Sequence, residues 1–268
     1  MTQEQNGVAT LPEQAKRLRD LHIMGHPLLL ANAWDCASAG VLQNAGFAAL
    51  GSTSRGIART MGYPDGEVIP VDLVFNVISR IAGSTDLPVT ADLETGFGLP
   101  ADELVQRMLA AGAVGLNLED SNLQGKCAGL VAAHEHAERV AAVRSAGAAA
   151  GVEVVINARV DVFLEPSGEP EAKMVEVLKR GRMYLEAGAD CVYPMGALDE
   201  EMISRLVGEL GAPINVVHWP GTPPIACLGS LGVARVSFAA GLLGQCLDYL
   251  ADKAKRILGG MDVVSVRS

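Results

Sequence analysis

The chain contains few cysteines, and their arrangement is uninformative for metal or disulfide chemistry. Its 268 residues include five cysteines, which are scattered and form no Cys-x-x-Cys pair. This pattern argues against a disulfide framework and against a zinc site, and it favours a reducing cytoplasm.

Basic charge and long apolar runs are also scarce. Lys and Arg number 21 against 31 Asp and Glu, which gives a formal net charge of −10. Nucleic acid and anionic membranes are therefore poor partners. The first twenty residues are polar, and no apolar run is long enough to span a bilayer. We expect neither a signal peptide nor a transmembrane helix, and we predict a cytoplasmic protein.

The glycine-rich fingerprint of dinucleotide-binding sheets is missing. Gly-x-Gly-x-x-Gly does not follow the first expected strand, where Asn-Ala-Trp-Asp stands at 32–35 instead. This absence argues against a doubly wound sheet, which is the structural alternative for a chain of this length.

A short pattern recurs along the chain: the end of a helix, a glycine, then an apolar strand. It occurs at Gly46, Gly112, Gly188 and Gly232. Glycine suits the left-handed position that ends a helix, so each copy indicates a helix-to-strand junction. Together with four further apolar runs, the pattern predicts eight strands, at 27–33, 47–50, 89–92, 113–118, 154–158, 189–193, 213–217 and 233–238.

Helical patterns separate these strands. We expect helices at 36–44, 71–81, 101–111, 133–150, 171–186, 199–209, 224–231 and 242–257. Eight alternating units in about 250 residues predict an α/β fold of the (β/α)8 TIM barrel type. No linker divides the chain, so 1–268 is expected to form one barrel domain, with 1–10 and 261–268 peripheral.

Carboxylates follow two of the expected strands. Asp92 and Glu94 end the run that begins at Pro88, and Glu119 ends the next strand. A carboxylate beside an apolar strand is costly to keep ionised unless a positive group neutralises it. Hard oxygen ligands grouped in this way suit Mg²⁺ better than metals that prefer sulfur or imidazole. The pattern predicts a magnesium site on Asp92, Glu94 and Glu119, in which Mn²⁺ is able to substitute.

Over roughly residues 20–250 the chain resembles the isocitrate lyase/phosphoenolpyruvate mutase superfamily. The resemblance rests on ordered motifs, namely Leu-Gly-Ser-Thr at 50–53, Gly-Tyr-Pro-Asp at 62–65, the Asp92–Gly98 segment, Leu-Glu-Asp at 118–120 and Asn-Ala-Arg-Val-Asp at 157–161. It implies a barrel whose last helix is exchanged between subunits, in a homodimer or homotetramer.

The resemblance also assigns roles to individual residues. Asp92 would bind the metal directly, and Glu94 and Glu119 partly through water. Ser52 and Thr53 would supply donors for the substrate carboxylate, and Arg159 would hold a carboxylate or phosphonate. Asp65 matches an active-site aspartate on the loop after the second strand. On the strand at 213–217, Asn215 is a further candidate substrate contact.

The loop after the fourth strand departs from the lyase branch of the superfamily. That branch carries a Lys-Lys/Arg-Cys-Gly-His motif whose cysteine is an acid/base, whereas this chain has Gly-Lys-Cys-Ala-Gly at 125–129. Cys127 is retained as the candidate acid/base, with Lys126 as the cationic neighbour that a reactive thiol needs. After the sixth strand, where many relatives place glutamate or histidine, this chain has Met195. The Lys-Asn-Ser type loop of the mutase branch is also missing.

The leading hypothesis is a Mg²⁺-dependent lyase that cleaves a C–C bond of a small 2-oxo or 2-hydroxy carboxylate through an enolate-type intermediate, in the manner of isocitrate lyase or oxaloacetate decarboxylase. The alternatives are P–C bond chemistry of the phosphoenolpyruvate mutase or phosphonopyruvate hydrolase type, and a non-catalytic ligand-binding barrel. A Schiff-base aldolase is disfavoured because none of the six lysines ends an expected strand.

Structural explanations compete with several of these functional assignments. Asp92 and Glu94 are also consistent with a helix N-terminus, and Glu119 and Asp120 with ordinary loop carboxylates. Arg159 and Asp161 are also consistent with a structural ion pair at the barrel rim. We expect His134 and His136 to be solvated rather than metal-bound, because residues two apart on a helix do not share a face.

Overall fold

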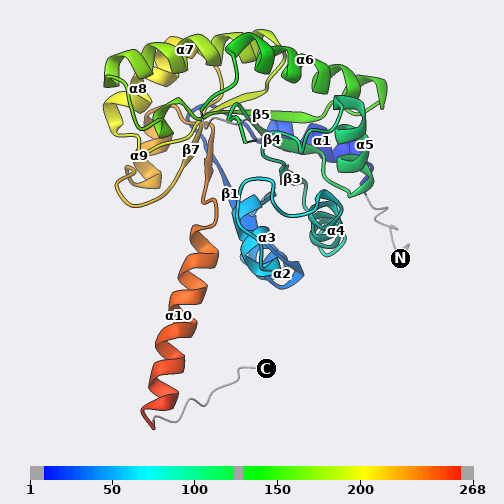
Figure 1. The fold of residues 1–268 in the computed structure, drawn as a ribbon, viewed down its shortest axis with the longest axis vertical. Coiled ribbons are helices and arrows are strands. Elements are labelled where there is room, and N and C mark those ends of the chain that lie inside the picture. Colours follow the sequence, from blue (N-terminus) through cyan, green and yellow to red (C-terminus); the bar gives the residue numbers. More distant parts are fainter. Residues whose placement is uncertain (1–8, 124–128, 261–268) are drawn as a thin grey trace, which may run out of the picture.

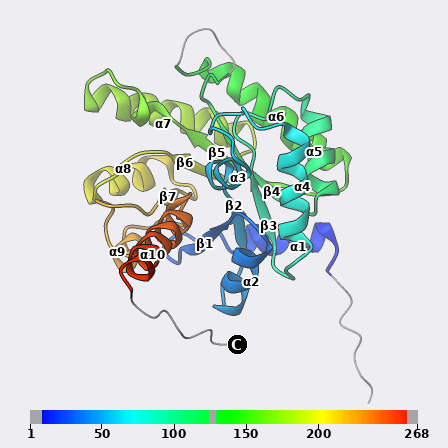
Figure 2. The same ribbon diagram turned by 60° about the horizontal axis from the view of Figure 1, so that its bottom comes forward.

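The computed structural model describes residues 9–123 and 129–260, and in it eight parallel strands form a barrel (Figure 2). The neighbours in the sheet run β6-β5-β4-β3-β2-β1-β8-β7. A parallel bridge from Val192 to Ile214 joins β6 to the start of β7 and closes the ring. The strands are β1 (Leu28–Ala33), β2 (Leu50–Ser52), β3 (Val89–Asp92), β4 (Gly115–Glu119), β5 (Val155–Val160), β6 (Cys191–Pro194), β7 (Asn215–Val217) and β8 (Arg235–Ser237).

The helices confirm the alternating pattern and add elements that the sequence did not predict. They are α1 (Leu11–Asp20), α2 (Cys36–Asn44), α3 (Ser54–Met61), α4 (Val71–Ala82), α5 (Ala101–Ala110), α6 (Ala133–Ala149), α7 (Pro170–Glu186), α8 (Glu200–Leu210), α9 (Ile225–Ser230) and α10 (Gly241–Leu258), with a short 3₁₀ helix η1 (Val162–Leu164). The predictions missed α1, α3 and η1. All eight predicted helices and seven of the eight predicted strands are present with small shifts at their ends. The second strand was placed too early, because the prediction 47–50 shares only Leu50 with β2.

The missed helix α3 matters most, because it follows β2 at the carboxyl end of the barrel. Its N-cap is Thr53, whose side chain accepts a hydrogen bond from the backbone of Gly56. It ends at Gly62, which adopts a left-handed conformation with φ of 82°. With eight residues and a glycine in its first turn, α3 gives a weak helical signal in the sequence.

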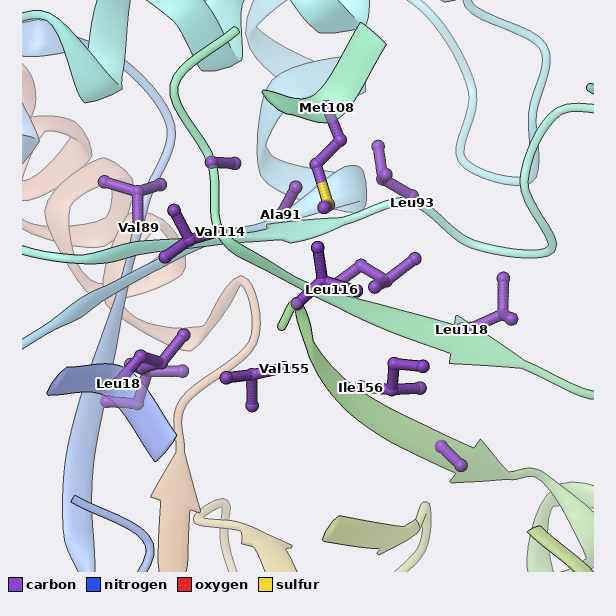
Figure 3. Packing of buried hydrophobic residues seen from close by; sticks show 14 of the residues in the cluster. Leu18, Val89, Ala91, Leu93, Met108, Val114, Leu116, Leu118, Val155 and Ile156 are labelled. Carbon is purple, nitrogen blue, oxygen red and sulfur yellow. The ribbon is translucent and has the colours of Figure 1, made fainter. Parts of the chain in front are cut away.

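Apolar side chains fill the space between the strands and the surrounding helices. Figure 3 shows Met108 of α5 close to Leu116 and Ala91, which come from two adjacent strands. At the amino-terminal end of the barrel, Leu18 of α1 packs so closely on Gly115 that a Cβ there would lie 2.9 Å from a leucine methyl. The helix α1 therefore closes the end of the barrel opposite to the strand carboxyl ends.

A buried polar cluster fixes the segment that follows β4. Asp120 is fully buried, and its carboxylate accepts hydrogen bonds from Arg180 (2.9 Å), the Tyr184 hydroxyl (2.7 Å) and the backbone N–H of Asp161 (2.9 Å). These partners lie on α7 and after β5, so the cluster ties three segments together. Asp120 is therefore part of a buried structural cluster and is not an ordinary loop carboxylate.

The expectation that His136 is solvated was wrong. The residue is 3% exposed, and its ring lies edge-on to Tyr184 with a centroid separation of 4.6 Å. Burial, reinforced by the charge of Arg180, lowers the pKa of His136 to about 4. Sequence spacing placed His134 and His136 on different faces of α6, and the packing decided which of the two faces is inside. His134 is exposed, as expected.

The last helix has little contact with the rest of the barrel. In Figure 1, α10 extends away from the other elements, and Leu243 near its start is its buried residue. Tyr249, Leu250, Ile257 and Leu258 are exposed apolar residues along its length. Among the described residues, no helix combines the length and apolar character required to cross a bilayer.

The buried histidine leads to a prediction about acid stability. Because the folded pKa of about 4 lies below the ordinary value near 6.5, the unfolded chain binds the proton more readily in that pH window. The contribution of neutral His136 to the free energy of unfolding is therefore fully present above pH 6.5 and is lost as the pH falls towards 4. At pH 5 the loss is about 2 kcal/mol.

Urea unfolding at pH 7 and pH 5 measures this effect. Between pH 7 and pH 5, we expect the free energy of unfolding of His136→Asn to fall by about 2 kcal/mol less than that of the wild type. The exposed His134→Asn is the matched control on the same helix and should retain the wild-type pH dependence. Equal pH dependence in all three proteins would contradict the assignment.

Candidate active site

A cavity of about 510 Å³ lies at the carboxyl ends of the strands. This is the end at which (β/α)8 barrels carry their active sites. The cavity is lined by side chains from strands around the ring and from the loops that follow them. They are Asn32, Thr53, Ser54, Arg55, Arg59, Asp65, Asp92, Asn117, Arg159, Leu164, Tyr193, Met195, Trp219, Ser237, Phe238, Ala239, Ala240 and Gly241.

Asp92 lies at the end of β3 and is held from two sides. Its Oδ2 accepts the backbone N–H of Ser54 at the start of α3 (2.9 Å), and its Oδ1 accepts the side-chain amide of Asn117 (3.2 Å). A carboxylate has about four acceptor positions, so further positions remain for a cation or a donor in the cavity.

The side-chain amide of Asn117 is itself oriented by hydrogen bonds inside the barrel. Its Oδ1 accepts hydrogen bonds from Nδ2 of Asn157 (2.8 Å) and from Nη2 of the fully buried Arg235 (3.0 Å). The oxygen is thereby directed towards two donors, and the NH₂ group towards Asp92. Donors from β5 and β8 thus determine the orientation of a carboxylate on β3.

Glu94 is 4% exposed and stands in a left-handed backbone conformation with φ of 50°. Its Oε2 accepts the backbone N–H of Glu67 (2.9 Å). Burial, reinforced by the negative charges of Asp92, Asp65 and Glu67, raises the pKa of Glu94 to about 8. The carboxylates are therefore close enough to repel one another when no cation is among them.

Glu67 links the segment after α3 to the loop after β3. Its Oε1 accepts the backbone N–H of Thr95 (2.9 Å), the hydroxyl of Thr95 (2.7 Å) and the backbone N–H of Phe97 (2.8 Å). Glu67 and Phe97 also have positive φ, at 59° and 56°. Left-handed non-glycine residues cost free energy and gather at functional sites, where the surrounding contacts hold them.

Glu119 and Arg159 form a buried ion pair at the ends of β4 and β5. Their atoms approach to 2.5 Å, and Arg159 also contacts both oxygens of Asp161 at 2.6 and 2.9 Å. Burial raises the pKa of Glu119 well above its usual range, Arg159 opposes the change, and Asp161, Asp92 and Glu94 reinforce it. The structural ion pair proposed for Arg159 and Asp161 is thus present, and Arg159 lines the cavity as well.

The carboxylates come near one another without forming a tight ligand shell. Within the described ranges, no three His, Cys, Asp or Glu side chains converge closely enough to ligate one ion together. Mg²⁺ dehydrates reluctantly and usually keeps several waters while binding one or two carboxylates directly. An arrangement with Asp92 as the direct ligand and Glu94 and Glu119 behind water fits this requirement, and the mutual repulsion around Glu94 favours a cation there.

The remaining predicted residues take different places. Asp65 lines the cavity and pairs with Arg55 at 3.2 Å. Thr53 lines it too, although its hydroxyl oxygen caps α3. Ser52 does not line it, because its Oγ accepts the backbone N–H of Asp92. Asn215 is fully buried beneath the cavity, and Cys127 lies outside the described residues.

Sequence reasoning missed Asn32, Asn117 and Tyr193. The side chain of Asn32 joins β1 to its neighbours, because its Nδ2 donates to the Ser52 carbonyl (2.8 Å) and its Oδ1 accepts the N–H of Phe238 (2.9 Å). Burial raises the pKa of Tyr193 to about 12, so its hydroxyl stays protonated at neutral pH. Asn32 and Tyr193 are polar residues one position before the carboxyl end of an apolar strand, close to the signal that had identified Asp92, whereas Asn117 lies in the middle of β4.

Comparison with known proteins agrees with the geometry. The family profile of phosphoenolpyruvate phosphomutase matches residues 18–258. An uncharacterized protein of Mycobacterium tuberculosis (strain ATCC 25618 / H37Rv) is 32% identical over 228 residues, which cover 83% of each chain. The 2-methylisocitrate lyase of Escherichia coli (strain K12) is 28% identical over 241 residues, 86% of this chain and 78% of the relative.

A solved structure extends the comparison to the fold. A crystal structure of a Burkholderia cenocepacia J2315 protein superposes with a TM-score of 0.85 at 39% identity, and the match covers 91% of this chain and 99% of that one. The barrel, the strand-end carboxylates and a profile match over nearly the whole chain agree. The chain belongs to the phosphoenolpyruvate mutase family of the isocitrate lyase/phosphoenolpyruvate mutase superfamily, a superfamily of lyases and mutases.

Proposed function

We propose that this protein is a Mg²⁺-dependent lyase that cleaves a C–C bond next to the keto or hydroxyl carbon of a small 2-oxo or 2-hydroxy carboxylate. The observation that carries the proposal is Asp92, whose carboxylate is oriented by Ser54 and Asn117 and lies near two further buried carboxylates at the mouth of the barrel. The match to relatives that include 2-methylisocitrate lyases supports C–C cleavage.

The metal would be held directly by Asp92 and through water by Glu94 and Glu119, and Mn²⁺ would substitute for it. Bound there, it supplies a Lewis acid for the oxygen of an enolate-type intermediate. The chain's own groups have separate tasks. Arg159, kept in position by Glu119 and Asp161, presents a guanidinium to the substrate carboxylate. The protonated hydroxyl of Tyr193, on the adjacent strand β6, is a neutral donor beside Arg159.

Proton transfer at the cleaved carbon is assigned to Cys127, with Asp65 at the mouth of the site. Ser52 would contribute to substrate binding by holding the backbone N–H of Asp92, and Thr53 by capping the start of α3. Asn215 would contribute from its buried position on β7. Phosphorus–carbon chemistry is the second candidate, because the matching family profile is that of a phosphomutase. A panel of oxaloacetate, 2-methylisocitrate, isocitrate and phosphonopyruvate with Mg²⁺ separates the two, and turnover of phosphonopyruvate alone would overturn the C–C assignment.

The role of Asp92 is tested by removing its charge. In Asp92→Asn we expect Mg²⁺ affinity to fall roughly 100-fold or more, because the direct ligand is lost while the shape is kept. In Asn117→Ala, which removes a side chain that orients Asp92, Mg²⁺ affinity should fall about 10- to 100-fold. Isothermal titration with Mg²⁺, alone and with oxalate, gives both values.

The control for this experiment is Asp86→Asn. Asp86 is an exposed carboxylate shortly before β3, at the opposite end of the strand from the site. Its variant should bind Mg²⁺ as the wild type does. Undiminished Mg²⁺ binding by Asp92→Asn would refute the metal assignment.

We also propose that the chain is one domain, works in the cytoplasm and forms a homodimer or homotetramer in which α10 is exchanged between subunits. The helix extends away from its own barrel (Figure 1) and carries exposed apolar residues, which an isolated subunit would leave in water. Beside its first turns, Val41 and Leu42 of α2 face Leu242 and Tyr249 of α10 across a mostly apolar groove.

Light scattering after size-exclusion chromatography tests this assembly. The wild type should have two or four times the subunit mass of 27.9 kDa. A double variant, Tyr249→Glu with Leu250→Glu, should be monomeric, because charge replaces the apolar surface of α10. Asp248→Asn on the same helix is the control and should keep the wild-type mass. A monomeric wild type would exclude the exchange.

A further inference from the structure

The charged groups that line the cavity are confined to one side of it. Asp92 and Arg159 come from β3 and β5, and Arg55, Arg59 and Asp65 come from α3 and the segment after it. Among the described lining residues, the segments that follow β6, β7 and β8 contribute no charged side chain. Figure 2 shows β6 and β7 on the side of the ring opposite β3 and β4.

Apolar side chains occupy this uncharged sector. Met195 follows β6, Trp219 follows β7 and Phe238 follows β8, and all three are partly exposed to the cavity. Leu164 of η1 adds a side chain that is 48% exposed. Exposed apolar surface inside a concave site, next to a small number of polar groups, is typical of a surface that binds the apolar part of a ligand.

The backbone holds this apolar wall in place. The N–H of Phe238 donates to Asn32 of the adjacent strand β1 (2.9 Å), and the next residue, Ala239, is left-handed with φ of 47°. The ring of Phe238 also packs against His218, with a centroid separation of 5.9 Å. Asn32 also donates to the Ser52 carbonyl, so the wall is linked through β1 to β2, the strand that leads into α3.

The apolar wall offers no cation to pair with a second carboxylate of the substrate. Burying a charge without a partner is costly. Arg159, the largely buried cation that lines the cavity, already pairs with Glu119 and Asp161. A methyl or methylene group placed there instead gains free energy from leaving water.

We infer that the substituent of the substrate that points towards β6–β8 is an alkyl group rather than a second carboxylate. The inference rests on the proposed function, because it places the carboxylate and keto or hydroxyl groups at Asp92 and Arg159. It narrows the substrate class to alkyl-substituted acids and disfavours substrates whose far end carries a negative charge.

Competition titration against oxalate in the presence of Mg²⁺ tests this preference on the wild-type protein. Along the series 2-oxobutanoate, 2-oxopentanoate and 2-oxohexanoate, affinity should rise about fourfold for each added methylene. The sharpest comparison is 5-methyl-2-oxohexanoate against 2-oxoglutarate, which have similar shape but an isopropyl group in place of a carboxylate. We expect the former to bind at least about tenfold more tightly.

Two variants of Met195 in the apolar wall should have different effects on the preference for an alkyl group. Met195→Leu should keep it, because the surface remains apolar. Met195→Arg should reverse it by supplying a cation for 2-oxoglutarate. The wild-type ligand series does not depend on either variant folding.

The competing location for a second carboxylate is Arg59, which lines the cavity from α3 and is exposed. Tighter binding of 2-oxoglutarate than of its isopropyl analogue, lost in Arg59→Gln, would overturn the inference while leaving the proposed function intact. Failure of oxalate and of every 2-oxo acid to bind with Mg²⁺ would instead remove the proposed function, and this inference with it.

Discussion

The position of the Asp92 carboxylate is the constraint on which the site depends. It is set by hydrogen bonds rather than by a neighbouring cation: Ser54 holds one oxygen and Asn117 the other. Asn117 is in turn oriented by Asn157 and Arg235. Four segments of the barrel are therefore needed to aim one side chain. Such outer contacts fix the geometry of a ligand and tune its affinity for a metal.

The same region stores unfavourable free energy. Glu94 and Glu119 are buried close to Asp92, and burial together with mutual repulsion raises the pKa of both. Left-handed residues at 67, 94 and 97 add backbone strain. The Glu67 carboxylate, with its three donors on the loop after β3, compensates part of this cost. A divalent cation at Asp92, as we propose, would relieve this repulsion.

Much of the architecture could be predicted from the sequence because parallel strands and helices leave strong local signals. The strand Val89–Asp92 and the helix Cys36–Asn44 have the predicted ends. The helix α3 was missed since it is short and carries a glycine in its first turn. That omission hid the Ser54 N–H, which is a partner of Asp92 that no motif reveals. Asn117 was likewise hidden, because an asparagine inside an apolar strand has no periodic signature.

The sequence by itself determined the class of fold, the family motifs and the acidic residues at the strand ends, because apolar periodicity and strand-end carboxylates are local properties of the chain. Only the tertiary structure decided what surrounds them. It buried Asn215 and His136, turned the Ser52 oxygen towards β3, paired Glu119 with Arg159 and separated the charged from the apolar wall of the cavity. Those outcomes depend on contacts between residues far apart in sequence, and closure of the ring creates these contacts.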